Sequence, residues 1–551
     1  MNFPGQENAE PTKISEAEAE YCRKNDIPLP TLSSTERLRQ MLLFRNRAYL
    51  YNTTCGLTGK KILSMVPPES GITVYDIEVW QSDVWDPLSY GQPYDFSRPF
   101  FEQFNELYRA VPQKNLAIFP ALQENSDYTN GITGAKNCYL LFASSYNEDC
   151  LMSYALWRCK NVLDCVYVRD CELCYSSTDL ENCYNVSFSI NSTNCSDSAF
   201  LESCQSCRNC YGCVNLSQKQ YHFFNKPLTR EQYEAELQKI DLGNYHRLRE
   251  EQDKFDRFRQ DFPSRAFIGR QNESYSGNYL QNVRNCENSY FVGRCEAVTD
   301  SLFLDNARYS ILHAMFGNNS ELVYHSVTVG DDAYDVRFSM ETWVSPQSLE
   351  YCALCGNGGT AHSFGCVGLK RSSYCILNKQ YSKEEYTELL PRIKAHMKST
   401  GEYGKFFPSE ISPFYFNQSD AAQFFPLNKE GAVKRGFRWI EDEELPATTP
   451  GKQVPYDISA ATDDIAAEVY QCEASGKQYR IPRNELSFLR QQRFPLPRLA
   501  PMERIRRRLA FFNIRPPQVI KCGKCHSPVQ FSGDPTSRPL YCEECFKNEL
   551  F

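Results

Sequence analysis

Short runs of alternating apolar and polar residues, separated by Asn, Asp, Ser and Gly, dominate the middle of the chain. At an offset of about 21 residues the cysteines of this region fall into columns, with Cys138 over Cys159 and Cys183 over Cys204. A fixed short period of this kind is typical of a solenoid. We therefore predict a parallel β-helix whose coils of about 21 residues each hold three short strands, with slim inward side chains stacked in ladders.

The solenoid pattern occurs twice. ENSDYTNGITGAKNCY, from Glu124, resembles NESYSGNYLQNVRNCE, from Asn272, and the segment from Tyr211 aligns without a gap on the segment from Phe364. This internal duplication predicts a mainly β protein with two solenoid arms.

Each copy ends at a helix start with capping-box spacing, Thr229 with Gln232 and Ser382 with Glu385. These helices are predicted to cap the arms. The expected order is a disordered tail (1–20), a degenerate zinc-ribbon-like module (21–90), a linker (91–122), arm 1 (123–227), capping and linker helices (228–263), arm 2 (264–381), a capping helix (382–400), a linker with short helices (401–468), and a basic helix with a zinc ribbon (469–551).

The C-terminal end carries metal-ligand spacing. Cys522 and Cys525 form one C-x2-C pair, Cys542 and Cys545 form another, and a hairpin-length segment separates them. Four thiolates arranged in this way hold Zn²⁺ tetrahedrally and leave no position for a reactive water. We expect one structural zinc ion and no other cofactor.

The N-terminus repeats this end in degraded form. With Pro28 set on Pro495, Cys55 falls on Cys522 while Thr58 replaces Cys525. A ribbon-like fold without zinc is expected there. Whether this module or Cys472 contributes to a further metal site stays open.

Composition limits the compartment and the role of the other cysteines. The chain of 551 residues holds 25 cysteines, has a formal net charge of -8, and contains neither a secretory signal nor a long apolar run. A cytoplasmic protein without a membrane segment, whose thiols stay reduced, is expected. In the run CQSCRNCYGC, Cys204, Cys207 and Cys210 align with Asn357, Thr360 and Ser363 of the second arm, so packing explains them better than an iron–sulfur cluster does.

Motifs for catalysis are absent from the sequence. No P-loop, H-E-x-x-H or G-x-S-x-G occurs, so no catalytic residue is assigned and no small-molecule substrate is evident. Asp331, Asp332, Asp335 and Arg337 could serve a carbohydrate-active β-helix enzyme, but turn positions explain them equally well. We interpret the chain as a non-enzymatic zinc-binding scaffold that binds another macromolecule, most simply a protein.

The competing hypothesis is nucleic-acid binding. It rests on a basic predicted helix beside the zinc ribbon, with candidate phosphate contacts at Arg504, Arg506, Arg507 and Arg508.

Several longer motifs carry a family resemblance: IPLPTLSSTERLRQ, VWDPLSYGQPYDFSRPFFEQF, FGCVGLKRSSYCILNKQYSKEEY, and the terminal CGKC with CEEC. In these the chain resembles an uncharacterised family of uncultured bacteria with very small genomes. The resemblance implies zinc-ribbon or treble-clef ends around cysteine-rich repeats, and no established activity. Relatives carry further cysteine ligands where Ser33–Ser34 and Ala500–Pro501 stand here, which argues against additional zinc sites, including any built on Cys472, without deciding the question.

Overall fold

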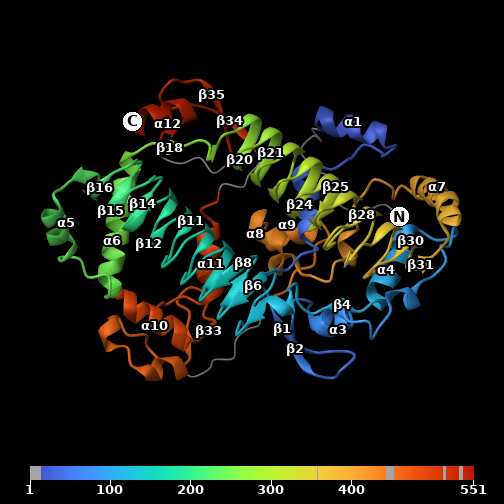
Figure 1. Cartoon of the computed structure of the whole chain (residues 1–551), viewed down its shortest axis with the longest axis horizontal. Helices are drawn as coiled ribbons and strands as arrows, with labels where there is room; N and C mark the ends of the chain where they lie inside the picture. Colours follow the sequence, from blue (N-terminus) through green and yellow to red (C-terminus); the bar gives the residue numbers. More distant parts are fainter. Residues whose placement is uncertain (1–13, 357, 442–451, 513–516, 533–537, 551) are drawn as a thin grey trace.

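Two parallel β-solenoid arms form the framework of the computed structural model, as the sequence predicted (Figure 1). The structure describes residues 14–356, 358–441, 452–512, 517–532 and 538–550. Arm 1 runs from β5 (Gln123–Glu124) to β17 (Lys226–Pro227), and arm 2 from β19 (Gly269–Arg270) to β31 (Lys379–Gln380). Each arm is a 13-stranded sheet that is wound into a coil.

The intermediate strands of arm 1 are β6 (Thr133–Lys136), β7 (Tyr139–Phe142), β8 (Ser145–Glu148), β9 (Leu151–Trp157), β10 (Val166–Arg169), β11 (Thr178–Glu181), β12 (Tyr184–Ser187), β13 (Ile190–Thr193), β14 (Ser196–Glu202), β15 (Arg208–Val214) and β16 (Gln220–Phe223). Those of arm 2 are β20 (Glu273–Gln281), β21 (Arg284–Gly293), β22 (Glu296–Thr299), β23 (Leu302–Asp305), β24 (Arg308–Asn318), β25 (Glu321–Val327), β26 (Gly330–Asp331), β27 (Tyr334–Arg337), β28 (Gln347–Glu350), β29 (Ala361–Phe364) and β30 (Ser373–Ile376).

The coil is shorter than predicted. Thr133 pairs with Ser145 and Val166 with Thr178, so one coil of arm 1 takes 12 residues rather than about 21. Arm 2 follows the same step, with one or two extra residues in some coils. The predicted period was wrong because the inward positions recur every third residue, so any offset that is a multiple of three aligns the cysteines.

A three-residue unit builds each side of the coil. Every third residue of arm 1 has a left-handed backbone, as at Asn137, Leu140 and Ala143 with φ of 54°, 50° and 53°, and the residue that follows it points inward. Asn and Asp tolerate this conformation better than other non-glycine residues do. Four such corners close one coil, which explains the many Asn and Asp residues.

The backbone N–H of an inward residue can donate to a polar side chain of the previous coil. Within one unit the outer Tyr139 and the corner Asn137 donate their N–H groups to carbonyls of adjacent coils, whereas the N–H of the inward Cys138 donates to Ser126 Oγ at 3.0 Å. In the same manner the N–H of Ser177 donates to Cys165 Sγ at 3.4 Å. Since a buried N–H requires an acceptor, cysteine and serine recur inside the arms.

Helices close the arms and cover their faces. They are α1 (Glu16–Lys24), α2 (Ser34–Leu42), α3 (Ile77–Gln81), α4 (Phe100–Ala110), α5 (Arg230–Leu237), α6 (Tyr245–Phe258), α7 (Lys383–Ser399), α8 (Asp420–Phe424), α9 (Lys429–Lys434), α10 (Arg483–Gln492), α11 (Pro501–Leu509) and α12 (Glu543–Leu550). Helices α5 and α7 begin with the two predicted capping boxes, which are both formed. Helix α2 packs on β24 and β25 of arm 2, and α11 packs on β9 and β10 of arm 1.

Three segments that were predicted to be a disordered tail or linkers contain folded structure. Helix α1 begins at Glu16, inside the expected tail, and α4 lies in the expected linker 91–122. The segment 401–468 contributes Phe407 and Phe416, both fully buried, to the main core. These segments are structured because their aromatic side chains fill the space beside arm 2. Residues 1–13 and 442–451 lie outside the described residues.

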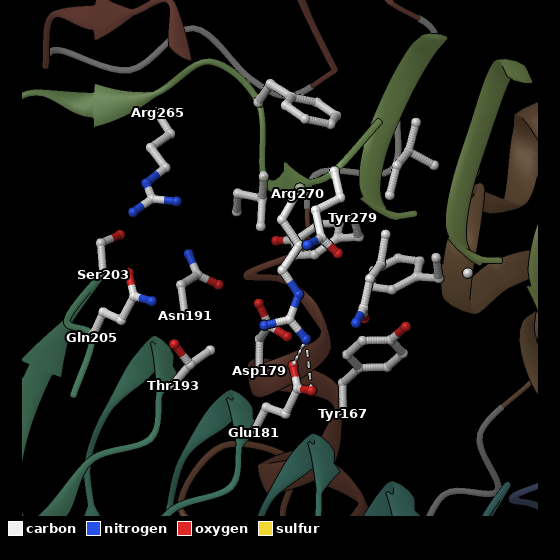
Figure 2. A pocket seen from close by; sticks show the side chains of 18 of the residues that line it. Tyr167, Asp179, Glu181, Asn191, Thr193, Ser203, Gln205, Arg265, Arg270 and Tyr279 are labelled. Atoms are coloured by element: carbon white, nitrogen blue, oxygen red, sulfur yellow. Dashed lines mark hydrogen bonds and ion pairs between the residues drawn. The ribbon is translucent and has the colours of Figure 1, made fainter. Parts of the chain in front are cut away.

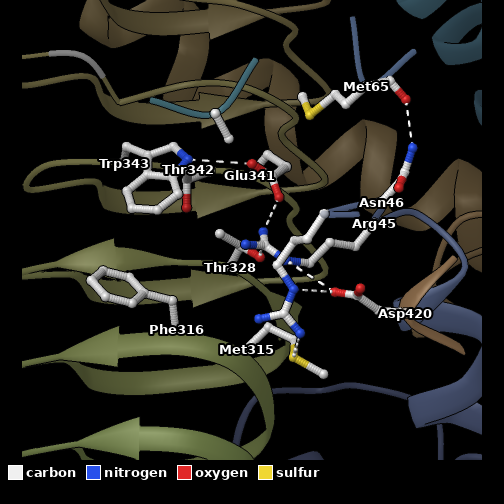
Figure 3. A network of polar contacts seen from close by, with 12 residues as sticks. Arg45, Asn46, Met65, Met315, Phe316, Thr328, Glu341, Thr342, Trp343 and Asp420 are labelled. Carbon is white, nitrogen blue, oxygen red and sulfur yellow. Dashed lines mark hydrogen bonds and ion pairs between the residues drawn. The ribbon is translucent and has the colours of Figure 1, made fainter. Parts of the chain in front are cut away.

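A buried polar network joins the N-terminal segment to arm 2 and to α8 (Figure 3). Arg45 contacts Glu341 and Thr328, and Arg47 Nε lies 2.7 Å from an Asp420 carboxylate oxygen. Burial alone would raise the pKa of Glu341, but the positive charges of Arg45 and Lys114 hold this pKa below its usual range. Arg47 also lies over the ring of Tyr154 of arm 1 at 5.0 Å, so this network ties the two arms together.

In the part of the chain that the structure describes, no helix combines the length and the apolarity that are needed to cross a bilayer.

Candidate functional site

Four cysteines converge at the C-terminus. Cys522 and Cys525 lie in the turn between β34 (Gln518–Lys521) and β35 (Pro528–Phe531), while Cys542 immediately precedes α12 and Cys545 lies in its first turn. Their four sulfur atoms all lie within 4.8 Å of one another. This is the donor set of a tetrahedral thiolate centre that could hold one metal ion.

Backbone N–H groups favour the thiolate form of Cys522 at this centre. The N–H of Cys542 donates to Cys522 Sγ at 3.3 Å, and the N–H of Cys545 donates to Cys542 Sγ at 3.4 Å. Burial would raise the pKa of Cys522, but N–H groups including those of Cys542 and Cys525 lower it to about 6. Because all four ligands come from the protein, a metal bound here would stabilise the fold and would not activate water.

The second ligand pair does not form a second ribbon knuckle. It lies at the start of a helix, so the module has a treble-clef-like arrangement rather than that of a ribbon with two equivalent turns. Residues 533–537, which fall within the predicted hairpin-length segment, lie outside the described residues.

The four cysteines together with β34, β35, β36 (Leu540–Tyr541) and α12 form what we call the metal module. This module spans the junction of the two arms (Figure 1). Its strand β36 pairs with β18 (Ser264–Arg265), the strand that leads into arm 2. Arg538 forms an ion pair with Glu202 of arm 1 at 2.7 Å. Tyr275 of arm 2 donates its hydroxyl to Glu543 at 3.1 Å. The module therefore contacts both arms and the segment that connects them.

The same knuckle occurs three times. The N–H of the first cysteine donates to the carbonyl five residues on, from Cys55 to Lys60, from Cys472 to Lys477 and from Cys522 to Ser527, at 2.8, 2.9 and 2.9 Å. The Cys55 knuckle joins β1 (Tyr51–Thr54) to β2 (Lys61–Ser64), and the Cys472 knuckle joins β32 (Tyr470–Gln471) to β33 (Gln478–Tyr479). The knuckle at Cys472 was not predicted, because only its first cysteine remains in the sequence.

Neither of the other two knuckles, at Cys55 and at Cys472, has a set of metal ligands around it among the described residues. In place of Cys525, Cys542 and Cys545, the N-terminal module has Thr58, Asp76 and Val79, and the N–H of Asp76 donates to Cys55 Sγ at 3.4 Å, as that of Cys542 does to Cys522. Among the described residues, only the set from Cys522 to Cys545 brings together three or more side chains that could bind a metal ion.

The cysteine run of arm 1 packs inside one coil. Cys204, Cys207, Cys210 and Cys213 are all buried at successive inward positions, and Cys204 donates its thiol to the carbonyl of Cys213 at 3.4 Å. Burial raises the pKa of a comparable inward thiol, Cys165, to about 12. Among the described residues, these four thiols do not form one of the clusters that could hold a metal ion.

The four arginines proposed for nucleic-acid binding divide into two pairs on α11. Arg504 is 5% exposed and lies 2.9 Å from both Asp164 of arm 1 and Glu485 of α10. Arg508 also faces arm 1, at 3.2 Å from Asp164. Arg506 and Arg507 are exposed and share Glu503. Arg504 and Arg508 therefore anchor the helix, and only two arginines of the predicted set face solvent.

The acids considered for an enzyme lie at solenoid corners. Asp332 and Asp335 have left-handed backbones, Asp331 accepts a hydrogen bond from Asn318 at 2.9 Å, and Asp335 pairs with Arg337 at 2.8 Å. The Asn318–Asp331 contact joins successive coils, and the Asp335–Arg337 pair lies within β27, so both contacts belong to the solenoid itself.

Sequence reasoning missed a cavity of about 440 Å³ where arm 1, arm 2 and the metal module meet (Figure 2). Its floor is formed by two rows of arm 1, and the opposite wall carries Arg265, Arg270 and Tyr279. Because these side chains come from distant segments, no local motif indicates them.

The comparisons with family models and with curated proteins find no relative. No family model and no curated protein matches the chain. A solved structure described as a proposed acetyltransferase from Desulfovibrio desulfuricans G20 covers 48% of this chain and 68% of its own, at 9% identity and a TM-score of 0.08. A similarity this low carries no argument, so the family resemblance stays a prediction.

Proposed function

We propose that this protein is a non-enzymatic scaffold, held together by one structural Zn²⁺, whose two solenoid arms bind another protein. Zinc is the metal that best suits four thiolates in a closed tetrahedral site. The partner-binding part of the proposal rests on one feature of the outer surface, which occurs on both arms.

Each arm carries the same exposed row of side chains on successive coils. Both rows have the order basic, acidic, basic, acidic, tyrosine. In arm 1 the row is Lys136, Glu148, Lys160, Glu172 and Tyr184. In arm 2 it is Arg284, Glu296, Arg308, Glu321 and Tyr334.

Stacking explains the charges of these rows but not the tyrosines. Lys160 lies 3.2 Å from Glu148, and Arg284 lies 2.9 Å from Glu296, as cross-strand ion pairs do. Tyr184 and Tyr334 are 47% and 48% exposed and have no aromatic or hydrogen-bonding partner among the described residues. Exposed tyrosines beside balanced charges are typical of protein-binding surfaces.

The alternating charges favour a protein over a nucleic acid as the partner. Binding to phosphates requires a net positive surface, whereas each row nearly neutralises itself. The basic helix α11 has lost half of its candidate contacts to ion pairs with the scaffold. We therefore expect the full chain to bind RNA and DNA no more tightly than about 10⁻⁶ M at physiological salt.

The test is capture of partners by the full chain from its native host, with nuclease-treated and untreated lysate. The double variant Tyr184→Ser/Tyr334→Ser should lose the captured protein by at least about tenfold, as the loss of interface hot spots does. Tyr146→Ser is the matched control, because Tyr146 is 62% exposed at a corner of arm 1 and is not a member of the row.

Equal capture by the double variant and by wild type would contradict a role for the rows. Loss of all capture after nuclease treatment would support the nucleic-acid hypothesis instead. Retention of one specific protein by wild type and by Tyr146→Ser alone would support the proposal.

A further inference from the structure

The cavity between the arms contains polar groups that the fold does not use. On its floor, Asn191, Thr193, Ser203 and Gln205 come from adjacent coils of arm 1. None of these four side chains makes a hydrogen bond within the described part of the protein, although each lines the cavity. Two are hydroxyls and two are amides, so together they can both donate and accept.

One arginine in the wall, Arg265, has no ion-pair partner among the described residues. Arg265 extends from β18 toward the floor of the cavity, and Figure 2 places it facing Ser203, Gln205 and Asn191. Its Nε atom is buried without a hydrogen-bond acceptor, and its guanidinium lies over the ring of Phe546 at 4.5 Å. Burial lowers the pKa of Arg265, so a nearby anion would relieve the cost of this charge.

The other charges of the cavity balance this positive charge only in part. Arg270 makes two contacts with Glu181, at 2.8 and 2.9 Å, and Lys547 pairs with Glu543. Asp179 lies beside this pair with no hydrogen-bond partner among the described residues, and burial raises its pKa to about 7. A carboxyl group that is about half protonated at neutral pH can donate a hydrogen bond and neutralises Arg265 only in part.

From these groups we infer that the cavity binds a small polyhydroxylated molecule that carries one anionic group, such as a sugar acid or a sugar phosphate. Arg265 would hold the anion, because a guanidinium forms bidentate hydrogen bonds with carboxylate and phosphate groups. The hydroxyl and amide rows of arm 1 would bind the sugar hydroxyls, which also donate and accept. The cavity volume of about 440 Å³ falls within the range of small-ligand sites.

The inference is tested by calorimetric titration of the full, metal-loaded chain with four probes: glucuronate, glucose 6-phosphate, neutral glucose and inorganic phosphate. We expect one of the two anionic sugars to bind at least about tenfold more tightly than glucose or phosphate, since each of these probes supplies only half of the contacts. The carboxylate and phosphate probes distinguish the two possible anions.

Variants locate the binding site. Arg265→Met should weaken binding of the anionic sugar by at least about tenfold, because it removes a charge-assisted contact. Thr193→Val, on the floor and away from the metal module, should weaken it by about threefold or more. Arg158→Met is the control, since Arg158 is 62% exposed by side chain and does not line the cavity. Unchanged metal content would exclude an effect of Arg265→Met on the module.

Absence of binding by both anionic sugars up to about 10 mM, which would detect even millimolar affinity, would overturn the inference. So would binding that Arg265→Met and Thr193→Val leave unchanged, or an equal affinity for neutral glucose.

Discussion

Arg37 and Arg504 are equivalent anchors in the two halves of the molecule. Arg37 binds both carboxylate oxygens of Glu18, at 2.5 and 2.8 Å, and Arg504 binds Glu485 at 2.9 Å. All four side chains are buried. The gap-free alignment of the chain ends pairs Arg37 with Arg504 and Glu18 with Glu485, so the two helix pairs are one repeated unit, which lies on arm 2 in one copy and on arm 1 in the other.

Loss of Arg504 should destabilise the C-terminal half strongly. Arg504→Met leaves two buried carboxyl groups without this partner, for which we expect a loss of about 3–5 kcal/mol in the free energy of unfolding. Arg506→Met is the control, since Arg506 is exposed and should change stability by about 0.5 kcal/mol or less. Limited proteolysis of segment 454–512 measures both, and equal resistance of the two variants would contradict the anchoring role.

Glu485 should make stability depend on pH. Burial raises the pKa of Glu485, the positive charge of Arg504 lowers it, and the negative charge of Asp164 raises it. The net result is an increase from 4.5 to about 7. The folded protein thus keeps a proton between about pH 4.5 and 7 that the unfolded chain releases, so stability falls as the pH rises through this window. Thermal unfolding at pH 5 and pH 7.5 should show a larger decrease for wild type than for Glu485→Gln. An equal decrease would contradict the shifted pKa.

At the scale of elements, the solenoid could be recognised from the sequence but its coil could not. The duplication and both capping boxes depend on local sequence and were predicted correctly. The coil length depends on which strands pair, and a period of three residues is compatible with many registers. Only the observed pairs, such as Thr133 with Ser145, select 12 residues.

Inward cysteines should be replaceable by serine and less well by valine. Cys165 accepts the N–H of Ser177 at 3.4 Å and donates its thiol to the carbonyl of Leu163. A serine can make both contacts, as Ser153 and Ser177 do in the same ladder. Cys165→Val leaves a buried N–H unpaired and should cost about 1–3 kcal/mol, whereas Cys165→Ser should cost less. Chemical denaturation followed by circular dichroism compares them, and the reverse order would contradict this explanation of the cysteines.

At the scale of the whole molecule, the metal module acts as a clasp between the arms. Cys522→Ser should release the metal ion and loosen both the module and the β18–β36 pairing, because metal binding at such a site is folding energy. Hydrogen exchange should accelerate at 264–266 and 538–550 while strands such as β10 keep their protection. Cys55→Ser, in a knuckle without a ligand set, should leave residues 538–550 unchanged. Uniform acceleration across both arms in Cys522→Ser would contradict the clasp.

The two sites differ in how far the sequence indicates them. The four metal ligands occur as two close pairs, so their spacing alone predicted the cluster that the structure assembles. The cavity takes Thr193 and Gln205 from arm 1, Arg265 from the connection and Phe546 from the metal module. Its existence depends on how the arms and the module pack, which no local pattern encodes.

The central claim is that only one of three related knuckles holds a metal ion, and that this ion is structural zinc. Elemental analysis of the purified full chain by mass spectrometry tests it most directly, with the triple variant Cys204→Ser/Cys207→Ser/Cys210→Ser measured alongside. We expect about one zinc and no iron per chain in both proteins, since among the described residues only the set from Cys522 to Cys545 is complete. Two or more zinc ions per chain, any stoichiometric iron, or loss of metal from the triple variant would contradict the account.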